Sequence, residues 1–191
     1  MRKIGLIAVL IALAGLAWYF IAGATTTTDI SASTPKDDNE QELIVVTPWE
    51  LTSIDPSKSG FIFQRLQLAE TLVDTAQNAD LQPMLAQSWS ANDKGDVWTF
   101  VLRDGVKFHD GSSLTADDVV KSLDVALTKP TALKSALISQ IKAIDSQTVE
   151  ITLEKPLMSL PAYLAHATSI ILAKSSFDDN NEVKELIGTG P

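Results

Sequence analysis

The hydrophobic pattern divides the chain into an apolar N-terminal run, a polar stretch, and a long region in which short apolar and polar segments alternate. Residues 4–24 are uncharged and almost wholly apolar, and Arg2 and Lys3 precede them. Because such a run cannot stay in water, residues 1–24 are predicted to be a signal peptide or a membrane anchor. The small residues at 22–24 suit cleavage, whereas about 20 apolar residues suffice to cross a membrane. Both alternatives place the rest of the chain outside the cytoplasmic membrane, since the basic pair stays inside.

The next three segments differ in pattern. Residues 25–41 are polar without periodicity, which is typical of a flexible linker. Residues 42–49 are apolar, rich in β-branched side chains and interrupted by Pro48, which predicts a buried strand. A turn-rich loop is expected over residues 51–60. The helical spacing of apolar side chains then predicts a helix over residues 61–75.

A stretch of short elements is predicted to follow. Residues 84–87 are expected to form a short helix. Residues 97–103 alternate with period two, which indicates a strand with one buried face. The side chains expected on that face are Trp98, Phe100 and Leu102. A tight turn at Asp104 and Gly105 is expected to let residues 106–108 pair back as a short hairpin arm.

A clear helix-start signal comes next. Thr115 and Asp118 have the spacing of a capping box, so a helix is predicted to begin there. Apolar side chains spaced by threes and fours give this helix its buried stripe. Lys129 and Pro130 are expected to end it. Residues 131–139 are predicted to form a second helical piece.

The C-terminal part is predicted to contain four further short elements. Residues 141–145 and 148–154 flank a two-residue turn and indicate a β-hairpin. One helical turn is expected over residues 161–166, and another apolar strand over residues 169–173. Residues 187–191 form a glycine-rich loop.

Composition narrows the functional classes. The chain has 191 residues, which allows one medium domain or part of a larger one, and its 45% hydrophobic content is ordinary for a globular protein. Fifteen basic residues against 24 acidic ones give a net charge of −9, which excludes general attraction to nucleic acid. The absence of cysteine excludes disulfides, thiolate metal sites and a lipid-modified cysteine. Two histidines cannot build a multi-histidine metal site, and no cofactor is expected.

Residues 88–124 carry the most specific motif, SWSANDKGDVWTFVLRDGVKFHDGSSLTADDVVKSLD. This run resembles the signature region of family 5 extracellular solute-binding proteins, which are peptide-binding and nickel-binding components of ABC importers. Four further segments match in the same order: LIVVTPWELTSIDPS, AETLVD, LQPMLAQSW and IGTGP. The resemblance therefore covers residues 42–191.

The resemblance implies a mixed α/β fold of the type II periplasmic-binding-protein kind, in which two lobes close on a solute. Residues 42–86 would begin lobe I, residues 87–168 would form most of an extra β-rich subdomain, and residues 169–191 would return to lobe I. Family members continue into a second lobe, so the chain is expected to be an N-terminal portion of a longer protein, a truncated fragment.

The function implied is that of a solute-binding component of an ABC import system. It would capture peptide-like solutes in the periplasm or another extracytoplasmic space and deliver them to permease subunits, without catalysis. An extracytoplasmic hydrolase is disfavoured, because it needs a nucleophile with a base or clustered carboxylates. Two alternatives stay open. One is a nickel or metal-chelate binding protein of the same family, and the other is a membrane-tethered sensor or adaptor that uses the same domain.

Two sequence cues on the ligand conflict. Nickel-type members use arginines after the hairpin to hold an anionic chelate, and residues 162–176 contain no arginine. The opening TPWELTSIDPSKSG, residues 47–60, is nonetheless closer to nickel-type subgroups than to oligopeptide binders. Ligand class is therefore open at this point.

The candidate ligand-binding residues are Pro48, Trp49, Glu50 and Phe61. Ligands of α/β sheets bind beyond the carboxyl ends of strands, and three of these residues lie where the first predicted strand ends. Trp49 is placed to stack on a ligand or to pack within the lobe, and Glu50 to meet a cationic group. Phe61 is a second aromatic candidate.

Other conspicuous residues are given structural roles. Gly188 and Gly190 are expected to let backbone pass close to the cleft. His109 lies beside Asp110 but has no third ligand or nucleophile near it, so no catalytic or metal residue is expected. His166 stands alone in an apolar stretch and is predicted to be a packed histidine.

Overall fold

The computed structural model describes residues 50–190, which belong to one compact unit. The predicted strand at residues 42–49 lies outside the described residues, as do the N-terminal run and the linker. The helices are α2 (Pro56–Arg65), α3 (Ala116–Thr128) and α4 (Leu160–Leu164), with short 3-10 turns η1 (Ala132–Ala136), η2 (Ala167–Ser169) and η3 (Lys174–Ser176). Within residues 50–190, no helix combines the length and apolar character that a membrane crossing requires.

A four-stranded antiparallel sheet forms the centre of the unit. Its spatial order is β3 (Ala86–Ala91), β4 (Val97–Leu102), β6 (Thr148–Leu153) and β5 (Ile138–Ala143). In the register, Phe100 of β4 lies between Trp89 of β3 and Val149 of β6. The predicted strand at residues 97–103 and the predicted hairpin at residues 141–154 are confirmed, although β5 starts earlier than expected.

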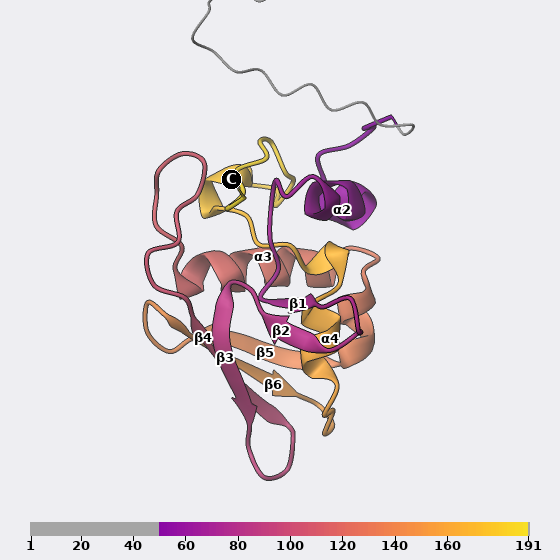
Figure 1. Cartoon of the computed structure of the whole chain (residues 1–191), viewed down its shortest axis with the longest axis vertical. Helices are drawn as coiled ribbons and strands as arrows, with labels where there is room; N and C mark the ends of the chain where they lie inside the picture. Colours follow the sequence, from indigo (N-terminus) through magenta and orange to yellow (C-terminus); the bar gives the residue numbers. More distant parts are fainter. Residues whose placement is uncertain (1–49, 191) are drawn as a thin grey trace, which may run out of the picture. The chain divides into compact units, whose positions relative to one another are not determined.

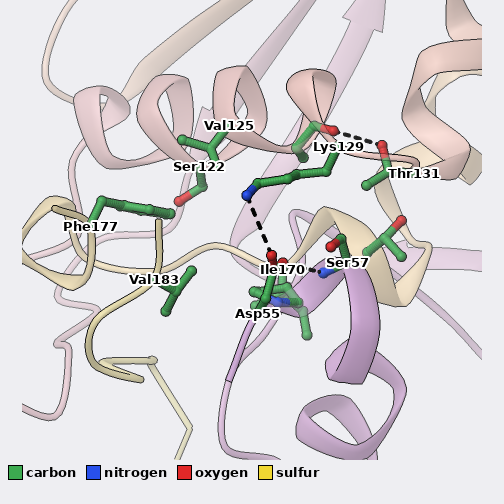
Figure 2. A pocket seen from close by; sticks show the side chains of 12 residues that line it. Asp55, Ser57, Ser122, Val125, Lys129, Thr131, Ile170, Phe177 and Val183 are labelled. Atoms are coloured by element: carbon green, nitrogen blue, oxygen red, sulfur yellow. Dashed lines mark hydrogen bonds and ion pairs between the residues drawn. The ribbon is translucent and has the colours of Figure 1, made fainter. Parts of the chain in front are cut away.

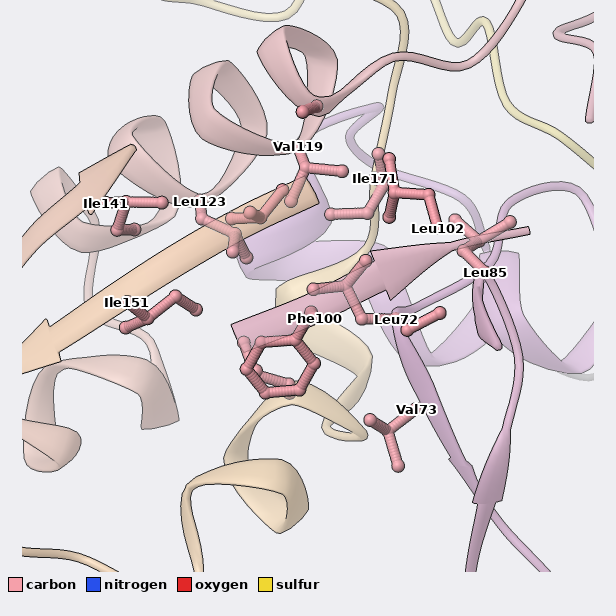
Figure 3. Close-up of a cluster of buried hydrophobic side chains, with 14 of the residues drawn as sticks. Leu72, Val73, Leu85, Phe100, Leu102, Val119, Leu123, Ile141, Ile151 and Ile171 are labelled. Carbon is pink, nitrogen blue, oxygen red and sulfur yellow. The ribbon is translucent and has the colours of Figure 1, made fainter. Parts of the chain in front are cut away.

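One face of this sheet packs against α3, which Figure 1 shows lying over the strands. Phe100, Val119, Leu123 and Ile151 are fully buried in the resulting core, which Figure 3 shows in detail. Trp98 and Leu102 are also buried, as period two predicted. Each such side chain contributes about 1.5–3 kcal/mol when it is fully buried, so this core is the main source of stability.

A second, smaller cluster lies on the other side of α3. It joins Val125 of α3 to Phe63 of α2 and to side chains of the C-terminal segment. Its buried members are Phe63, Ala69, Val125, Ile170, Leu172 and Phe177. α3 therefore contributes to both clusters and holds the α2 region against the sheet domain.

The capping box predicted for α3 is confirmed. The Asp118 carboxylate accepts hydrogen bonds from the amide of Thr115 at 3.0 Å and from its hydroxyl at 2.5 Å. Its other oxygen accepts from the amide of Lys174 at 3.0 Å, so the cap also fixes the C-terminal segment. The helix ends at Thr128, before Lys129 and Pro130, as expected.

The predicted helix at residues 61–75 is wrong in both boundaries. α2 begins at Pro56, inside the predicted loop, because the Asp55 carboxylate caps the amide of Ser57 at 2.8 Å and proline suits the first helical turn. The helix ends at Arg65, and Gln67 adopts a left-handed conformation with φ of 55°. The apolar side chains beyond it belong instead to an extended segment that leads into β1 (Val73–Thr75).

Two other predictions are wrong. Residues 84–87 do not form a helix, because β2 (Leu81–Pro83) pairs with β1 and β3 starts at Ala86. Residues 169–173 are buried but do not form a ladder strand: the amide of Ile171 donates to Glu70, whereas that of Ala173 donates to Ile187.

The smaller expected elements are largely found. The prediction that residues 106–108 pair back as a hairpin arm is wrong, because Lys107 forms a bridge with Ser113, further along the chain. The helical piece expected over residues 131–139 is the 3-10 turn η1, and the helical turn expected over residues 161–166 is α4.

Candidate functional site

The candidate ligand residues lie at the start of the described chain. Pro48 and Trp49 lie outside the described residues. Glu50 is exposed, and Phe61 is 56% exposed on α2. The guanidinium of Arg65 lies 5.2 Å from the centre of the Phe61 ring, a cation–π contact one helical turn away. The structure thus leaves Glu50 and Phe61 available to a ligand or partner.

Three large apolar side chains, one on α2 and two shortly before it in the sequence, are exposed, and we call them the α2 apolar surface. They are Leu51, Ile54 and Phe61, with exposed fractions of 49%, 36% and 56%. Exposed apolar patches mark binding sites, so these three side chains, which are close together in sequence, are candidates for contact with a ligand. The α2 apolar surface includes one of the residues proposed from sequence and adds two that sequence reasoning missed.

The buried side of α2 fixes its position. Phe63 is fully buried in the smaller cluster, and Gly60 lies against the backbone of Ala167. A side-chain carbon at Gly60 would collide with the Ala167 carbonyl oxygen, so only glycine permits this approach. Phe61 is therefore presented to solvent by a helix that is anchored on its other side.

An ion-pair cluster ties the start of α2 to the end of α3. Figure 2 shows the Lys129 ammonium pointing to the Asp55 carboxylate, at 3.6 Å. The same ammonium lies 2.5 Å from the Glu182 carboxylate. The cavity beside these groups has a volume of about 20 Å³, room for roughly one water molecule, so it is not a solute pocket.

The ion pairs and caps shift the ionisation of both partners. Burial alone would raise the pKa of Asp55, but hydrogen bonds from Ser57 and the charges of Lys129 and Lys58 bring that pKa below its usual value. The hydrogen bond to Glu182 raises the pKa of Lys129, against the opposing effect of burial and with further help from the Asp55 charge. Both groups therefore stay charged over the physiological pH range.

The two histidines have different surroundings. The ring of His109 contacts the backbone of Gly188 and Gly190. His166 is exposed and caps η2 by accepting a hydrogen bond from the amide of Thr168 at 3.2 Å, so the prediction of a packed histidine is wrong. Among residues 50–190, no group of three or more histidine or carboxylate side chains is arranged to hold a metal ion.

The glycine-rich segment near the C-terminus makes a close backbone contact, while its predicted position beside the cleft stays a prediction. Side-chain carbons at Gly188 and Gly190 would collide with the backbone of residues 67–69. The contact is with the segment that follows α2, a partner that the sequence did not indicate.

One open concavity has a volume of about 430 Å³ and lies between the start of α3 and the β5–β6 turn. It is lined by Thr115, Asp117, Ala143, Asp145, Ser146 and Lys174. Lys174 pairs with Asp117 at 3.3 Å across its rim. Sequence reasoning missed this feature, because the lining residues come from three distant segments.

Comparison with known proteins identifies the family. The sequence model of the bacterial extracellular solute-binding proteins, family 5 Middle, matches residues 80–191. The chain belongs to this family. The glutathione-binding protein GsiB of Escherichia coli (strain K12) is 28% identical over 162 residues, covering 79% of this chain and 31% of GsiB. The chain thus spans about a third of the length of the curated relatives that it matches.

Solved structures of similar proteins share the fold. A nickel ABC transporter protein from Bacillus halodurans is 32% identical with a TM-score of 0.64, covering 73% of this chain and 29% of its own. NikA from Staphylococcus aureus in complex with Ni(L-His)2 is 26% identical with a TM-score of 0.66, and the match covers 75% of this chain and 30% of NikA. DppA from Helicobacter pylori in complex with peptide STSA is 28% identical with a TM-score of 0.61, and the match covers 73% of this chain and 34% of DppA.

The comparisons confirm the resemblance to family 5 that the sequence motifs indicated. The fold is a partial type II periplasmic-binding-protein fold of mixed helix and sheet. Family 5 members are extracellular solute-binding proteins; GsiB is a glutathione-binding protein and DppA a periplasmic binding protein.

Proposed function

We propose that this chain belongs to the solute-binding component of an ABC import system, which captures peptide-like solutes and delivers them to permease subunits. The family match over residues 80–191 carries this proposal. Similarity to the glutathione-binding GsiB and to DppA with its bound peptide supports a peptide-like solute. In this role the protein binds and releases without catalysis.

The α2 apolar surface is the part of the described chain that we assign to solute contact. Together with Pro48, Trp49 and Glu50 it supplies aromatic, aliphatic and acidic groups close together in sequence. A ligand that touches this surface and a second lobe favours the closed arrangement over the open one, which is capture by population shift. The acidic Glu50 is suited to the amino group of a peptide.

A nickel or metal-chelate ligand is the second candidate. The identity of 32% to the nickel transporter protein of Bacillus halodurans, and the likeness to NikA with Ni(L-His)2, favour it. The absence of arginine from residues 162–176 argues against an anionic chelate held as in nickel-type members. We therefore rank peptide above chelate.

We further propose the following division of the chain. Residues 1–24 act as a signal peptide or membrane anchor, and residues 25–41 as a linker. Residues 42–86 begin lobe I, residues 87–168 form the extra subdomain, and residues 169–191 return to lobe I.

If residues 1–24 are retained, the protein is tethered to the cytoplasmic membrane, and a role as a tethered sensor or adaptor becomes the alternative. Mass spectrometry of the mature N-terminus distinguishes the two, because a start near Thr25 removes the tether.

Isothermal titration of the full-length protein tests the ligand. Glutathione, tripeptides, the tetrapeptide STSA and Ni(L-His)2 are titrated in turn. We expect saturable heat from at least one peptide and none from the nickel complex. Saturable heat from Ni(L-His)2 alone would transfer the assignment to metal chelates, and no heat from any of them would contradict both.

A further inference from the structure

His109 makes three hydrogen bonds to one distant backbone segment. Its amide donates to the carbonyl of Gly188 at 2.9 Å. Its ring accepts at Nδ1 from the amide of Gly188 at 3.3 Å, and its Nε2 lies 3.0 Å from the carbonyl oxygen of Gly190. We call this arrangement of His109, Gly188 and Gly190 the His109 latch.

The partners determine which ring nitrogen carries the proton. Nδ1 faces an N–H group and must offer a lone pair, whereas Nε2 faces a carbonyl oxygen and must carry hydrogen. Both bonds therefore form only with the neutral ring protonated at Nε2. A second proton, on Nδ1, would set two donors against each other at the amide of Gly188.

The latch holds a segment that has other close contacts. Gly188 and Gly190 lie against the backbone of residues 67–69, and the Thr189 hydroxyl donates to the Glu70 carboxylate at 2.7 Å. The latch thus joins the loop after β4 to the segment that follows α2. The loop after β4 and the segment after α2 are distant from each other in sequence. The loop belongs to the proposed extra subdomain, and the segment belongs to the proposed lobe I.

We propose that the His109 latch is proton-sensitive: Nδ1 of the neutral imidazole binds the Gly188 amide, and that amide loses its acceptor when the ring takes up a second proton. Histidine is the side chain that ordinarily changes charge between about pH 5 and 8. An extracytoplasmic protein is exposed to the pH of its surroundings. Acidification therefore removes one of the three hydrogen bonds between His109 and residues 188–190 and exposes the Gly188 amide, a response that solute binding alone does not require.

The charged groups around the latch are already engaged. The Asp110 carboxylate accepts from the Ser112 amide at 2.9 Å and from Ser175, and these bonds lower its pKa, chiefly through the Ser112 hydroxyl. Glu70 is bound to Thr189, and Lys107 donates to the Ser113 hydroxyl at 2.7 Å. On the C-terminal side, Lys174 pairs with Asp117.

No charged side chain of residues 50–190 forms an ion pair with His109. The hydrogen bonds to backbone are therefore the polar interactions that ring protonation changes directly.

His166 provides a matched control. It is the second of the two histidines in the sequence, and its Nδ1 also accepts a backbone hydrogen bond, from Thr168. That bond is local, within two residues, and fastens no distant segment. Protonation of His166 therefore has no direct effect on the Gly188 amide.

Hydrogen exchange of the full-length chain tests the proposal. Protection of the Gly188 amide is measured from about pH 8 to about pH 5, corrected for intrinsic exchange and referred to the Phe100 amide in β4. Loss of one neutral hydrogen bond predicts that protection falls about two- to tenfold on acidification. His109→Asn keeps an acceptor near the Nδ1 position and does not titrate, so it should abolish the pH dependence. His166→Asn should retain it.

Two results would overturn the proposal: protection of Gly188 that does not change with pH, or a pH dependence that persists in His109→Asn. If that variant does not fold, imidazole ¹⁵N spectra of the unmodified chain decide instead. The latch requires the Nε2–H form of His109 at about pH 8, and a Gly188 amide shift that follows the ring titration. The Nδ1–H form, or a Gly188 shift that does not follow, would contradict it. These measurements need no solute, so their outcome is independent of the proposed transport function.

Discussion

The Lys129 ammonium lies 3.6 Å from the Asp55 carboxylate and joins the end of α3 to the start of α2. Both side chains are mostly buried, with exposed fractions of 20% for Lys129 and 14% for Asp55. Asp55 also caps α2 through the amide of Ser57. One carboxylate therefore starts the helix that carries Phe61 and also fixes it against α3.

Asp55→Ala should destabilise the protein by about 1–2 kcal/mol, because it removes both the cap and the ion pair. Asp55→Asn should cost less, since an amide oxygen still caps the helix. Urea unfolding measures both values. Asp93→Asn, an exposed acidic residue in the β3–β4 turn, is the control and should change little. Equal losses for the alanine and asparagine variants would contradict a capping role.

The contribution of Asp55 to the stability of the fold depends on pH, and the lowered pKa fixes the direction of that dependence. Its folded pKa lies below the usual value of 3.8, because the Ser57 hydrogen bonds and the Lys129 charge outweigh burial. Its contribution to stability is therefore present above that value and is lost as pH falls through the lowered pKa. Stability measured against pH should decline less steeply below about pH 4 in Asp55→Asn than in the unmodified chain. Parallel acid profiles would contradict this.

Asp118 is a second carboxylate with several partners, and it is buried. Its oxygens accept hydrogen bonds from Thr115 at the start of α3 and from the Lys174 amide in the C-terminal segment. Asp118→Ala leaves these donors without partners and should cost about 2–3 kcal/mol in thermal or urea unfolding. Asp117→Ala is the matched control on the same helical turn, because its pair with Lys174 is exposed and should contribute little. Similar losses from the two variants would contradict this assignment.

Local signals account for the parts of the fold that sequence predicted well. The alternation through Phe100 predicted β4 correctly because one face of that strand is buried. The spacing of Thr115 and Asp118 predicted the start of α3 correctly because the two residues form a capping box. α2 was misplaced because Asp55 and Pro56 form a helix start that apolar spacing alone does not reveal.

Long-range contacts account for the parts that sequence did not predict. The segment at residues 169–173 has strand-like composition, but the Leu172 backbone is bound by the Ser122 hydroxyl, at 3.0 Å, and not by a neighbouring strand. The pairing of Lys129 with Asp55 and that of His109 with Gly188 also join residues that are distant in the chain. Of the four candidate ligand residues, only Glu50 and Phe61 lie in the described part, and their solute contact stays a prediction.

Gly60 offers a steric test of how α2 is docked. A side-chain carbon there would collide with the Ala167 carbonyl oxygen, so Gly60→Ala should force α2 away from η2. We expect a loss of about 1–3 kcal/mol in urea unfolding, in the range of other overpacked sites. Gly105→Asn is the control, because no atom lies within 4 Å of a side-chain carbon there and asparagine tolerates its φ of 75°. An unchanged stability in Gly60→Ala would show that the contact is not close.

Substitutions of Phe61 and Phe100 distinguish a role in solute binding from a role in stability. Phe100 is fully buried, so Phe100→Ala should cost about 3–5 kcal/mol in unfolding. Phe61 is 56% exposed, so Phe61→Ala should change stability by less than about 0.5 kcal/mol. In titrations with a bound peptide, Phe61→Ala should weaken affinity about tenfold, because a buried aromatic contact contributes roughly 1–2 kcal/mol. Met158→Ala, at an exposed apolar residue outside the α2 apolar surface, should leave affinity unchanged. Full affinity in Phe61→Ala would remove α2 from the solute site while leaving the family assignment intact.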